Sequence, residues 1–393
     1  MLVAPDCFTG TLTAQQAAMA ISAGWRRQAP HDELTTMPLS DGGPGFIEAL
    51  SGALDGRVVA ATVLGPRSRP TPAALLLVED RRADGGTRRT AYIESAQAAG
   101  LHLLEAGERD PRYTSTFGVG QLLEIALDEG ATRIIVGLGG SGTNDGGAGL
   151  LAALGAGPAG PLASGGGPLT ELTVADLQGL PTVQQRFSGI ELVAATDVDN
   201  PLLGFDGASA VFGPQKGAAP VVAQLLEGAL GHLVDMAGRV LPARVDLVTG
   251  QPRRLEREPG AGAAGGLGWA LMLLGGHRVS GVDTVLSAVD FGAQMSRHDL
   301  VVTGEGTVDG ESLRGKVVSG VARAAMRAAL PCVVIAGQVQ VGRREAMAAG
   351  VSGIYPVAQT PEEVEAALLD PVTTLTARTS RVAATWSPGR NVS

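Results

Sequence analysis

Short apolar runs alternate with amphipathic segments along most of the chain, and this alternation is its clearest structural signal. Runs typical of buried strands lie at 2–4, 58–64, 73–78, 90–93, 134–136, 192–195, 300–302, 333–336 and 353–357. Helical patterns follow most of them, at about 13–24, from 46, 117–129, 148–154, 220–238, 262–274, 317–329, 344–349, and from 361 and 372. The pattern predicts an α/β protein with a mostly parallel sheet that helices cover on both faces.

Local signals sharpen several of these elements. Thr13 and Gln16 predict a capping box at the start of the first helix. RRADGGTRR, between two apolar runs, predicts a hairpin, and the Gly/Pro/Ala/Ser-rich stretch 156–168 predicts a mobile excursion. Ligands of such sheets collect at the carboxyl ends of strands, so the glycine-rich loops after the strands are the candidate sites.

Composition and charge narrow the class of protein. The chain has 393 residues, of which 45% are hydrophobic, 18% charged and 3% aromatic, and its formal net charge is −9. The length predicts two domains, and the acidic, aromatic-poor composition argues against nucleic acid or anionic membrane as a partner. Two cysteines are too few for a zinc site or a disulfide framework, so we expect a cytoplasmic protein.

Lysine and asparagine are rare, and the few that occur gather in glycine-rich loops. The only lysines are Lys216, in GPQKGA, and Lys316, in GESLRGKVV, although Lys and Arg together number 30. Asn144 and Asn200 lie in GGSGTNDGG and TDVDNPLL. A lysine ammonium meets phosphate as a point charge, which the planar arginine fork does not reproduce. The pattern indicates a site that handles phosphate; coincidence is the alternative.

The strongest single motif is GLGGSGTNDGGAG, which follows the apolar run 134–136. Its glycine pairs enclose four polar residues, Ser141, Thr143, Asn144 and Asp145. Polar side chains and free backbone amides, placed where bulky residues are excluded, suit a polar ligand. A tight turn held by internal hydrogen bonds is the structural alternative.

A pair of carboxylates follows the next apolar run, in TDVDNPL. Asp197 and Asp199 are two residues apart, so both could point the same way. With the nearby Asn200 oxygen they suit Mg²⁺, or one of them could accept the proton of an attacking hydroxyl. An Asx-type turn before Pro201 explains the same residues without a ligand.

Three further loops place polar residues at strand ends. Asp6 in PDCFTGTLT and Asp41 in LSDGGPG each precede a helix start, where anions bind, with helix capping as the alternative. The segment VVTGEGTVDGESLRGKVV has Val317 where a Walker A loop needs a hydroxyl, so we do not interpret it as one. It still carries four candidate ligand-binding residues, Glu305, Asp309, Ser312 and Lys316.

GAGAAGGLG (260–268) matches the dinucleotide-binding pattern GxGxxG and contains Gly262 and Gly265. The segment before it, RRLEREP, is charged rather than strand-like, which disfavours a Rossmann NAD site. An anion-binding helix start or close helix packing explains the glycines better. A nicotinamide-dependent dehydrogenase therefore remains a rival that rests on this match alone.

Taken in order, seven motifs resemble those of the bacterial glycerate kinase family, type I: PDCFTG, SDGGPG, GGSGTNDGGAG, DVDNPLLG, ASAVFGPQKGA, PGAGAAGGLG and TGEGTVDGESLRGK. The resemblance runs from Leu2 to about Gly337 and more weakly beyond. It implies a flavodoxin-like (Rossmann-like) domain formed by 1–66 and 285–393. It also implies an inserted restriction-endonuclease-like α/β domain over 67–284.

The resemblance further implies transfer of the γ-phosphoryl group of ATP, with Mg²⁺, to D-glycerate, giving phosphoglycerate, with 2-phosphoglycerate favoured. Asp197 or Asp199 would then hold Mg²⁺ or act as base, and Lys216 and Lys316 would neutralise phosphate. Asn144, Asp145 and Ser141 would orient glycerate, and the remaining candidates would complete a single crevice. The partners expected are ATP and D-glycerate, with a homodimer open.

The chain departs from the family pattern at several loop positions. Thr9 stands where the family has lysine, Cys7 replaces serine, Thr307 replaces arginine and Pro44 replaces glutamate. Because phosphoryl transfer depends on charge neutralisation, these losses matter. Three explanations remain: cations from Arg67, Arg69, Arg314 or Lys316, a different hydroxy acid substrate, or a non-catalytic sensor of glycerate or nucleotide.

Overall fold

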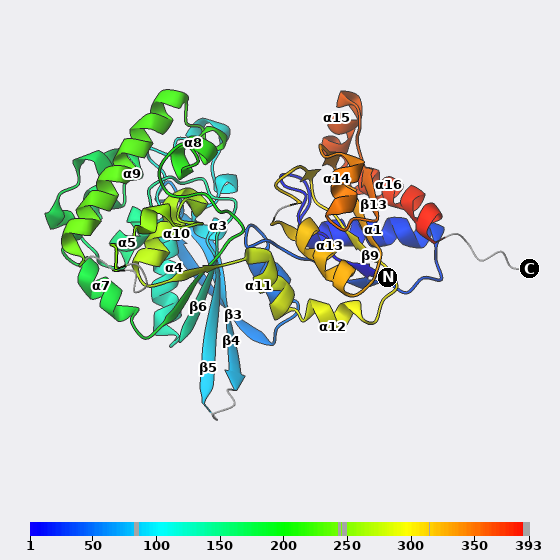
Figure 1. Ribbon diagram of the computed structural model, residues 1–393, viewed down its shortest axis with the longest axis horizontal. Helices are drawn as coiled ribbons and strands as arrows, with labels where there is room; N and C mark the ends of the chain where they lie inside the picture. Colours follow the sequence, from blue (N-terminus) through cyan, green and yellow to red (C-terminus); the bar gives the residue numbers. More distant parts are fainter. Residues whose placement is uncertain (82–85, 243–244, 246–249, 314, 388–393) are drawn as a thin grey trace, which may run out of the picture. The chain divides into compact units, whose positions relative to one another are not determined.

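The computed structural model describes residues 1–81, 86–242, 245, 250–313 and 315–387 (Figure 1). The chain divides into two compact units. Unit 1 comprises 1–41, 48–53 and 281–393, and unit 2 comprises 42–47 and 54–280. The first boundary differs from the expected break near 66, because β3 (Gly56–Leu64) pairs along its length with β4 (Pro70–Arg81) and so belongs to unit 2.

Unit 1 contains a five-stranded sheet in the order β13-β11-β9-β1-β2, and every pairing in it is parallel. The first strand of the chain is therefore central, with β2 on one side and β9 on the other. A short parallel ladder joins β10 to β12. The strands of unit 1 are β1 (Leu2–Val3), β2 (Thr35–Thr36), β9 (Val301–Thr303), β10 (Thr307–Val308), β11 (Cys332–Ala336), β12 (Gln338–Val339) and β13 (Gly353–Pro356).

Helices cover this sheet because the apolar side chains of its strands point alternately to its two faces. Val3, Val302 and Val333 pack into one core with residues of α1 and α16, so their strand neighbours point to the opposite face. The helices α1 and α16 lie side by side (Figure 1), and a Cβ on Gly24 would approach the Thr376 carbonyl to 2.3 Å. The helices are α1 (Ala14–Gln28), α11 (Gly281–Ala288), α12 (Phe291–Met295), α13 (Val317–Arg327), α14 (Arg343–Ala348), α15 (Pro361–Leu369) and α16 (Pro371–Trp386).

Unit 2 is built on a six-stranded mixed sheet in the order β3-β4-β5-β6-β7-β8. The first two pairings are antiparallel and the last three are parallel. Its remaining strands are β5 (Thr87–Glu94), β6 (Arg133–Gly137), β7 (Glu191–Ala195) and β8 (His277–Val279). The carboxyl ends of β6 and β7 lead directly into GLGGSGTNDGGAG and TDVDNPL.

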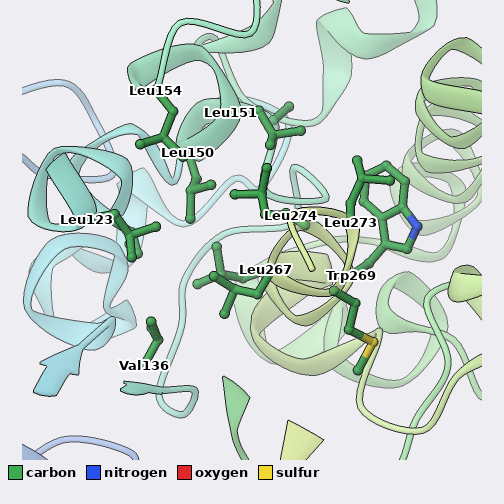
Figure 2. Close-up of a cluster of buried hydrophobic side chains, with 14 of the residues drawn as sticks. Leu123, Val136, Leu150, Leu151, Leu154, Leu267, Trp269, Leu273 and Leu274 are labelled. Carbon is green, nitrogen blue, oxygen red and sulfur yellow. The ribbon is translucent and has the colours of Figure 1, made fainter. Parts of the chain in front are cut away.

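Helices pack on the unit 2 sheet through an extended apolar core. Figure 2 shows part of it, where leucines of the segment 148–154 meet Trp269 and Leu273. The unit 2 helices are α3 (Ala96–Ala99), α4 (Phe117–Asp128), α5 (Ala148–Ala153), α6 (Ala159–Leu162), α7 (Leu180–Arg186), α8 (Ala208–Phe212), α9 (Pro220–Val240) and α10 (Ala263–Leu273). Helix α2 (Phe46–Ser51) is divided between the two units.

Most of the predicted elements are confirmed, including the capping box of α1, in which Thr13 and Gln16 bond reciprocally. The prediction for 156–168 was wrong: α6 lies there, followed by a 3₁₀ helix (Gly167–Glu171), and Leu162 is fully buried. The strands β4 and β5 pair as expected, while residues 82–85 at the hairpin tip lie outside the described residues. No helix among the described residues is both long and apolar enough to span a membrane.

Candidate active site

Asp145 is the anchor of the GLGGSGTNDGGAG loop in unit 2. It is fully buried, and its carboxylate accepts hydrogen bonds from the Thr116 amide (2.8 Å) and hydroxyl (2.9 Å). The amides of Gly147 (3.0 Å) and Gly149 (3.2 Å) donate to it as well. Burial raises the pKa of this carboxyl, and the four hydrogen bonds oppose the rise. The carboxylate is thus occupied in fixing the loop at the start of α5.

Lys216 is buried against the same loop. Its side chain is only 2% exposed, and Nζ donates to Ser141 Oγ at 2.9 Å and to the Thr143 carbonyl oxygen at 2.7 Å. Burial lowers the pKa of Lys216 to about 7, and the nearby Asp145 carboxylate partly offsets this effect. Gly217 turns the chain after it at φ +93°, where a Cβ would lie 2.0 Å from the Arg109 carbonyl oxygen.

Asn144 and Thr143 present polar atoms that the loop itself does not satisfy. Asn144 Nδ2 donates to Ser209 Oγ at 2.9 Å, but Asn144 Oδ1 is buried without a hydrogen-bond partner among the described residues. The same holds for Thr143 Oγ1. Buried polar atoms are nearly always paired in folded proteins. These two atoms are therefore candidates to bind a polar ligand beside Lys216.

The glycine-rich segment 260–268 packs tightly behind this loop. Ala264, Gly265 and Gly266 all have positive φ, and a Cβ on Gly265 would lie 2.0 Å from the Thr143 carbonyl oxygen. A Cβ on Gly262 would lie 2.2 Å from the Pro201 carbonyl oxygen. Close backbone packing thus accounts for Gly262 and Gly265, two of the three glycines of the GxGxxG match.

The two carboxylates after β7 have different partners. Asp199 is 77% exposed and forms an ion pair with Arg278 (2.6 Å). Asp197 accepts a hydrogen bond from Ser280 Oγ at 2.7 Å. Asn200 donates from Nδ2 to the Asp206 carbonyl oxygen at 2.8 Å, which is a turn-closing contact.

Unit 1 gathers three carboxylates, Asp6, Asp41 and Glu305, at the carboxyl edge of its sheet. Asp6 follows β1 and Glu305 follows β9, and both are buried. Burial, followed by repulsion from Asp41 and Glu305, raises the pKa of Asp6 well above its usual range. Burial also raises the pKa of Glu305 to about 7, against the opposing effects of Ser312 and Lys316. Repulsion among these groups means that each disfavours ionisation of its neighbour.

Lys316 is the cation nearest this carboxylate set. It caps the start of α13, and its pKa is raised because Glu305, Asp309 and Asp41 together outweigh its partial burial. Asp309 and Ser312 form a local turn, in which Asp309 Oδ1 accepts from the Ser312 amide at 3.0 Å. The sequence-predicted residues of this segment therefore do lie together in unit 1.

The unit 1 carboxylates fit a divalent cation better than Asp197 and Asp199 do. Glu305 is 6% exposed and its Oε1 has no hydrogen-bond partner among the described residues, whereas Asp199 is already neutralised by Arg278. No group of three or more His, Cys, Asp or Glu side chains suited to a metal occurs in the described part of the chain. Mg²⁺ does not need such a group, since it usually takes one or two carboxylates together with waters and phosphate oxygens.

The candidate residues thus form two sets, one within each unit, rather than a single list. The sequence-based predictions did not include four residues that hold the candidate side chains in place. They are Thr116, Ser209, Arg278 and Ser280. Ser209 lies in the motif ASAVFGPQKGA, but nothing in the sequence marks Thr116, Arg278 or Ser280, because each is an ordinary polar residue that acts through a contact distant in the chain.

Known proteins of similar sequence and structure agree on one family. The model of the glycerate kinase family matches residues 1–387. This chain belongs to the glycerate kinase family. It is 39% identical to glycerate kinase of Bacillus subtilis over 91% of this chain and 90% of that one. It is also 39% identical to glycerate 2-kinase of Escherichia coli over 86% and 85%.

A solved structure extends the likeness to the fold. The protein designated glycerate kinase 2 from Salmonella typhimurium LT2 aligns with a TM-score of 0.70 at 36% identity, covering 98% of this chain and 97% of that one. The expected α/β class is confirmed, and membership of a kinase family implies a phosphotransferase that uses a nucleotide. The finer fold names, flavodoxin-like and restriction-endonuclease-like, stay predictions.

Of the family departures, Cys7, Thr9 and Thr307 lie in unit 1 and Pro44 lies in unit 2. Thr9 and Thr307 both line one cavity of unit 1. The lysine and the arginine that the family pattern has at these two positions are therefore absent from the wall of this cavity. Of the substitute cations considered, Arg69 pairs with Glu108 and Arg67 stacks on Tyr113, both in unit 2. Arg314 lies outside the described residues. Lys316 is therefore the candidate substitute that lies with the unit 1 carboxylates.

Proposed function

We propose that this glycerate kinase family member transfers the γ-phosphoryl group of ATP to a hydroxyl of D-glycerate, with Mg²⁺ as cofactor and 2-phosphoglycerate as the favoured product. Family membership over nearly the whole chain supports the reaction class. The observation that carries the proposal is the buried Lys216, which is held against a loop with unsatisfied polar atoms. We also propose that the protein works in the cytoplasm, where both substrates occur.

The unit 2 set suits the small anionic acceptor. A lysine ammonium has three N–H donors, and Ser141 and the Thr143 carbonyl use two of them. The third would bind the carboxylate of glycerate or the transferred phosphoryl group. Asn144 Oδ1 would accept a hydrogen bond from a substrate hydroxyl, which would satisfy an otherwise orphaned buried oxygen.

The unit 1 set suits the nucleotide. One or two of the carboxylates Asp6, Asp41 and Glu305 would hold Mg²⁺ together with water and phosphate oxygens, and the ion would neutralise charge on the polyphosphate and orient it. Lys316 would contact phosphate oxygens as a point charge, with Asp309 and Ser312 fixing the turn before it. Each unit would therefore bind one of the two substrates.

Asp197 would be the carboxylate that accepts the proton of the substrate hydroxyl. Asp145 accepts four hydrogen bonds that fix its own loop and Asp199 is exposed and ion-paired, whereas Asp197 closely follows β7 and accepts a hydrogen bond from Ser280 Oγ. A base must approach within hydrogen-bond distance of the hydroxyl whose proton it removes. Asp145 would then act by positioning the Asn144 loop.

The test is glycerate-dependent formation of ADP by the purified protein, measured with and without D-glycerate over a range of Mg²⁺ concentrations. A Lys216→Met variant prepared in parallel controls for contaminating ATPases. We expect ADP only when glycerate is present, and ³¹P NMR of the product then assigns the 2- or 3-phosphate. Absence of glycerate-dependent ADP at every Mg²⁺ concentration would reject the kinase proposal.

The second candidate is a sensor that binds glycerate or nucleotide without turnover. The threonines at positions 9 and 307, where the family pattern has cations, favour it. Calorimetric titration of MgADP and of D-glycerate separates the two. A sensor binds at least one of them and releases no ADP.

A further inference from the structure

Unit 1 contains a cavity that the catalytic groups do not use. Its volume is about 100 Å³, and it lies beside the turn Thr9-Gly10-Thr11, which the Phe8–Leu12 backbone bridge closes. Apolar side chains dominate the wall and come from four separate segments: Phe8, Val357, Val364, Ala367, Leu368 and Leu375. A cavity of this size admits a flat heterocycle but not a whole nucleotide.

The position of this cavity in the sheet is the first argument for a ligand. In the order β13-β11-β9-β1-β2, the chain leaves β1 toward β2 and later returns to β9 on the opposite side of β1. This reversal is a topological switch point, and open parallel sheets bind ligands just beyond the carboxyl ends of the strands there. Phe8 comes from the loop after β1, and Gly306 and Thr307 come from the segment after β9.

The connection to the carboxylate set is the second argument. Glu305 immediately precedes Gly306, and Asp6 lies two residues before Phe8. The backbones of these segments are joined, because the Asp6 amide donates to the Gly304 carbonyl at 2.8 Å and the Gly337 amide donates to the Glu305 carbonyl at 3.1 Å. The apolar cavity and the carboxylates are therefore neighbouring parts of one sheet edge.

We propose that this cavity binds the nucleobase of the phosphoryl donor, with its phosphates directed toward Asp6, Glu305 and Lys316. The proposal rests on the kinase function and adds where the base binds. A nucleobase has two apolar faces that gain from burial among such side chains, whereas glycerate has little apolar surface to bury. The Gln338 carboxamide, also on the wall, offers both a donor and an acceptor to the base edge.

Helix α15 provides a matched pair of variants. Ala367 lines the cavity, while its neighbour Ala366 is exposed and does not. Ala367→Trp should fill the cavity and Ala366→Trp should leave it open. No residue of α15 is buried, so the core tolerates either change. Calorimetric titration of each full-length variant with MgADP and, separately, with D-glycerate reads the two ligands independently.

We expect Ala367→Trp to weaken MgADP binding by roughly tenfold or more, as loss of about 1.4 kcal/mol implies, with glycerate binding unchanged. Ala366→Trp should match the wild type for both ligands. Unchanged MgADP binding by Ala367→Trp, or a selective loss of glycerate binding, would overturn the assignment. If Ala367→Trp loses both ligands, photolabelling of the wild type with 8-azido-ATP decides: adducts in 357–375 support the cavity, and adducts in unit 2 reject it.

These outcomes are separable from failure of the kinase proposal. A wild type that releases glycerate-dependent ADP, together with an unaffected Ala367→Trp, keeps the kinase function and rejects the base site. A wild type that binds MgADP without turnover, together with a weakened Ala367→Trp, keeps the base site and rejects the kinase function.

Discussion

The polar sites of the two units differ in the charges that they bury. In unit 2 the Lys216 ammonium is bonded to neutral oxygens of the Ser141–Thr143 segment, with the hydrogen-bonded Asp145 carboxylate nearby. In unit 1 Asp6 and Glu305 are enclosed with Asp41 nearby, and Lys316 stands at the margin. Burial lowers the pKa of Lys216 to about 7 and raises that of Glu305 to about 7. Loss of hydration on burial therefore brings the pKa values of a lysine and a glutamate to about the same value, although their charges are opposite.

The difference between the sites indicates the charge that each one lacks. An anion beside Lys216 would stabilise its ammonium form, and a cation beside Glu305 would stabilise its carboxylate form. A small hydroxy acid supplies the first and a metal-bound nucleotide supplies the second. This difference agrees with the proposal that the acceptor binds in unit 2 and the donor in unit 1, which the following variants test.

Replacement of Lys216 should have the largest effect on activity. We expect Lys216→Met to lower kcat/KM by about 100-fold or more, as removal of a single stabilising group in a closed site often does. Arg239→Met, which removes an exposed cation of α9, is the control and should retain activity within about twofold. Glycerate titration should show the loss, and MgADP titration should not.

The pH dependence of stability gives the same variant a second readout. Because the pKa of Lys216 is lowered from 10.5 to about 7, the unfolded chain binds a proton that the folded chain lacks between these values. The wild type should therefore gain stability relative to Lys216→Met as pH rises from 7 to 10. A Tm difference that is constant over this range would show that Lys216 keeps an ordinary pKa.

Asp145 should contribute chiefly to stability. Asp145→Ala leaves four buried donors without an acceptor, so we expect the free energy of unfolding to fall by about 3 kcal/mol. Asp176→Ala, which removes only the exposed contacts to Thr173, should cost about 1 kcal/mol or less. Urea unfolding measures both. If both variants lost the same free energy of unfolding, the four hydrogen bonds to Asp145 would not contribute more to stability than the exposed contacts of Asp176.

Glu305 provides the opposite test in unit 1. Its pKa is raised from 4.5 to about 7, so the folded chain holds a proton that the unfolded chain releases between these values. Wild-type stability should fall relative to Glu305→Gln as pH rises from 4.5 to 7, and the variant should bind MgADP several-fold more weakly. Glu345→Gln, at an exposed carboxylate of α14 in the same unit, should change neither quantity. Thermal unfolding across this pH range, with MgADP titration, gives both readouts.

The smallest effect should come from Asp199. Its ion pair with Arg278 is largely exposed, so Asp199→Asn should change stability by less than about 1 kcal/mol. The Mg²⁺ concentration for half-maximal activity should stay within about twofold of the wild-type value. A tenfold increase in that Mg²⁺ concentration would place the metal in unit 2 and would contradict the proposal that unit 1 binds it.

Much of the fold could be read from the chain, because short apolar strands and capped helices are local patterns. The residues Thr13 and Gln16 need only each other to fix a helix start, and the contacts of that capping box are present. The stretch 156–168 was misread because its small residues resemble a linker, whereas the burial of Leu162 depends on packing that no local pattern encodes.

The sequence determined that Lys216 and Asn144 are unusual, and its ordered loops determined the family. Only the tertiary structure decided what those residues do, because burial sets their chemistry. It enclosed Lys216 and fixed Asp145 through Thr116, which lies 29 residues away. It also paired Asp199 with Arg278. Hydration and long-range hydrogen bonds depend on the folded chain as a whole, so no motif could have reported them.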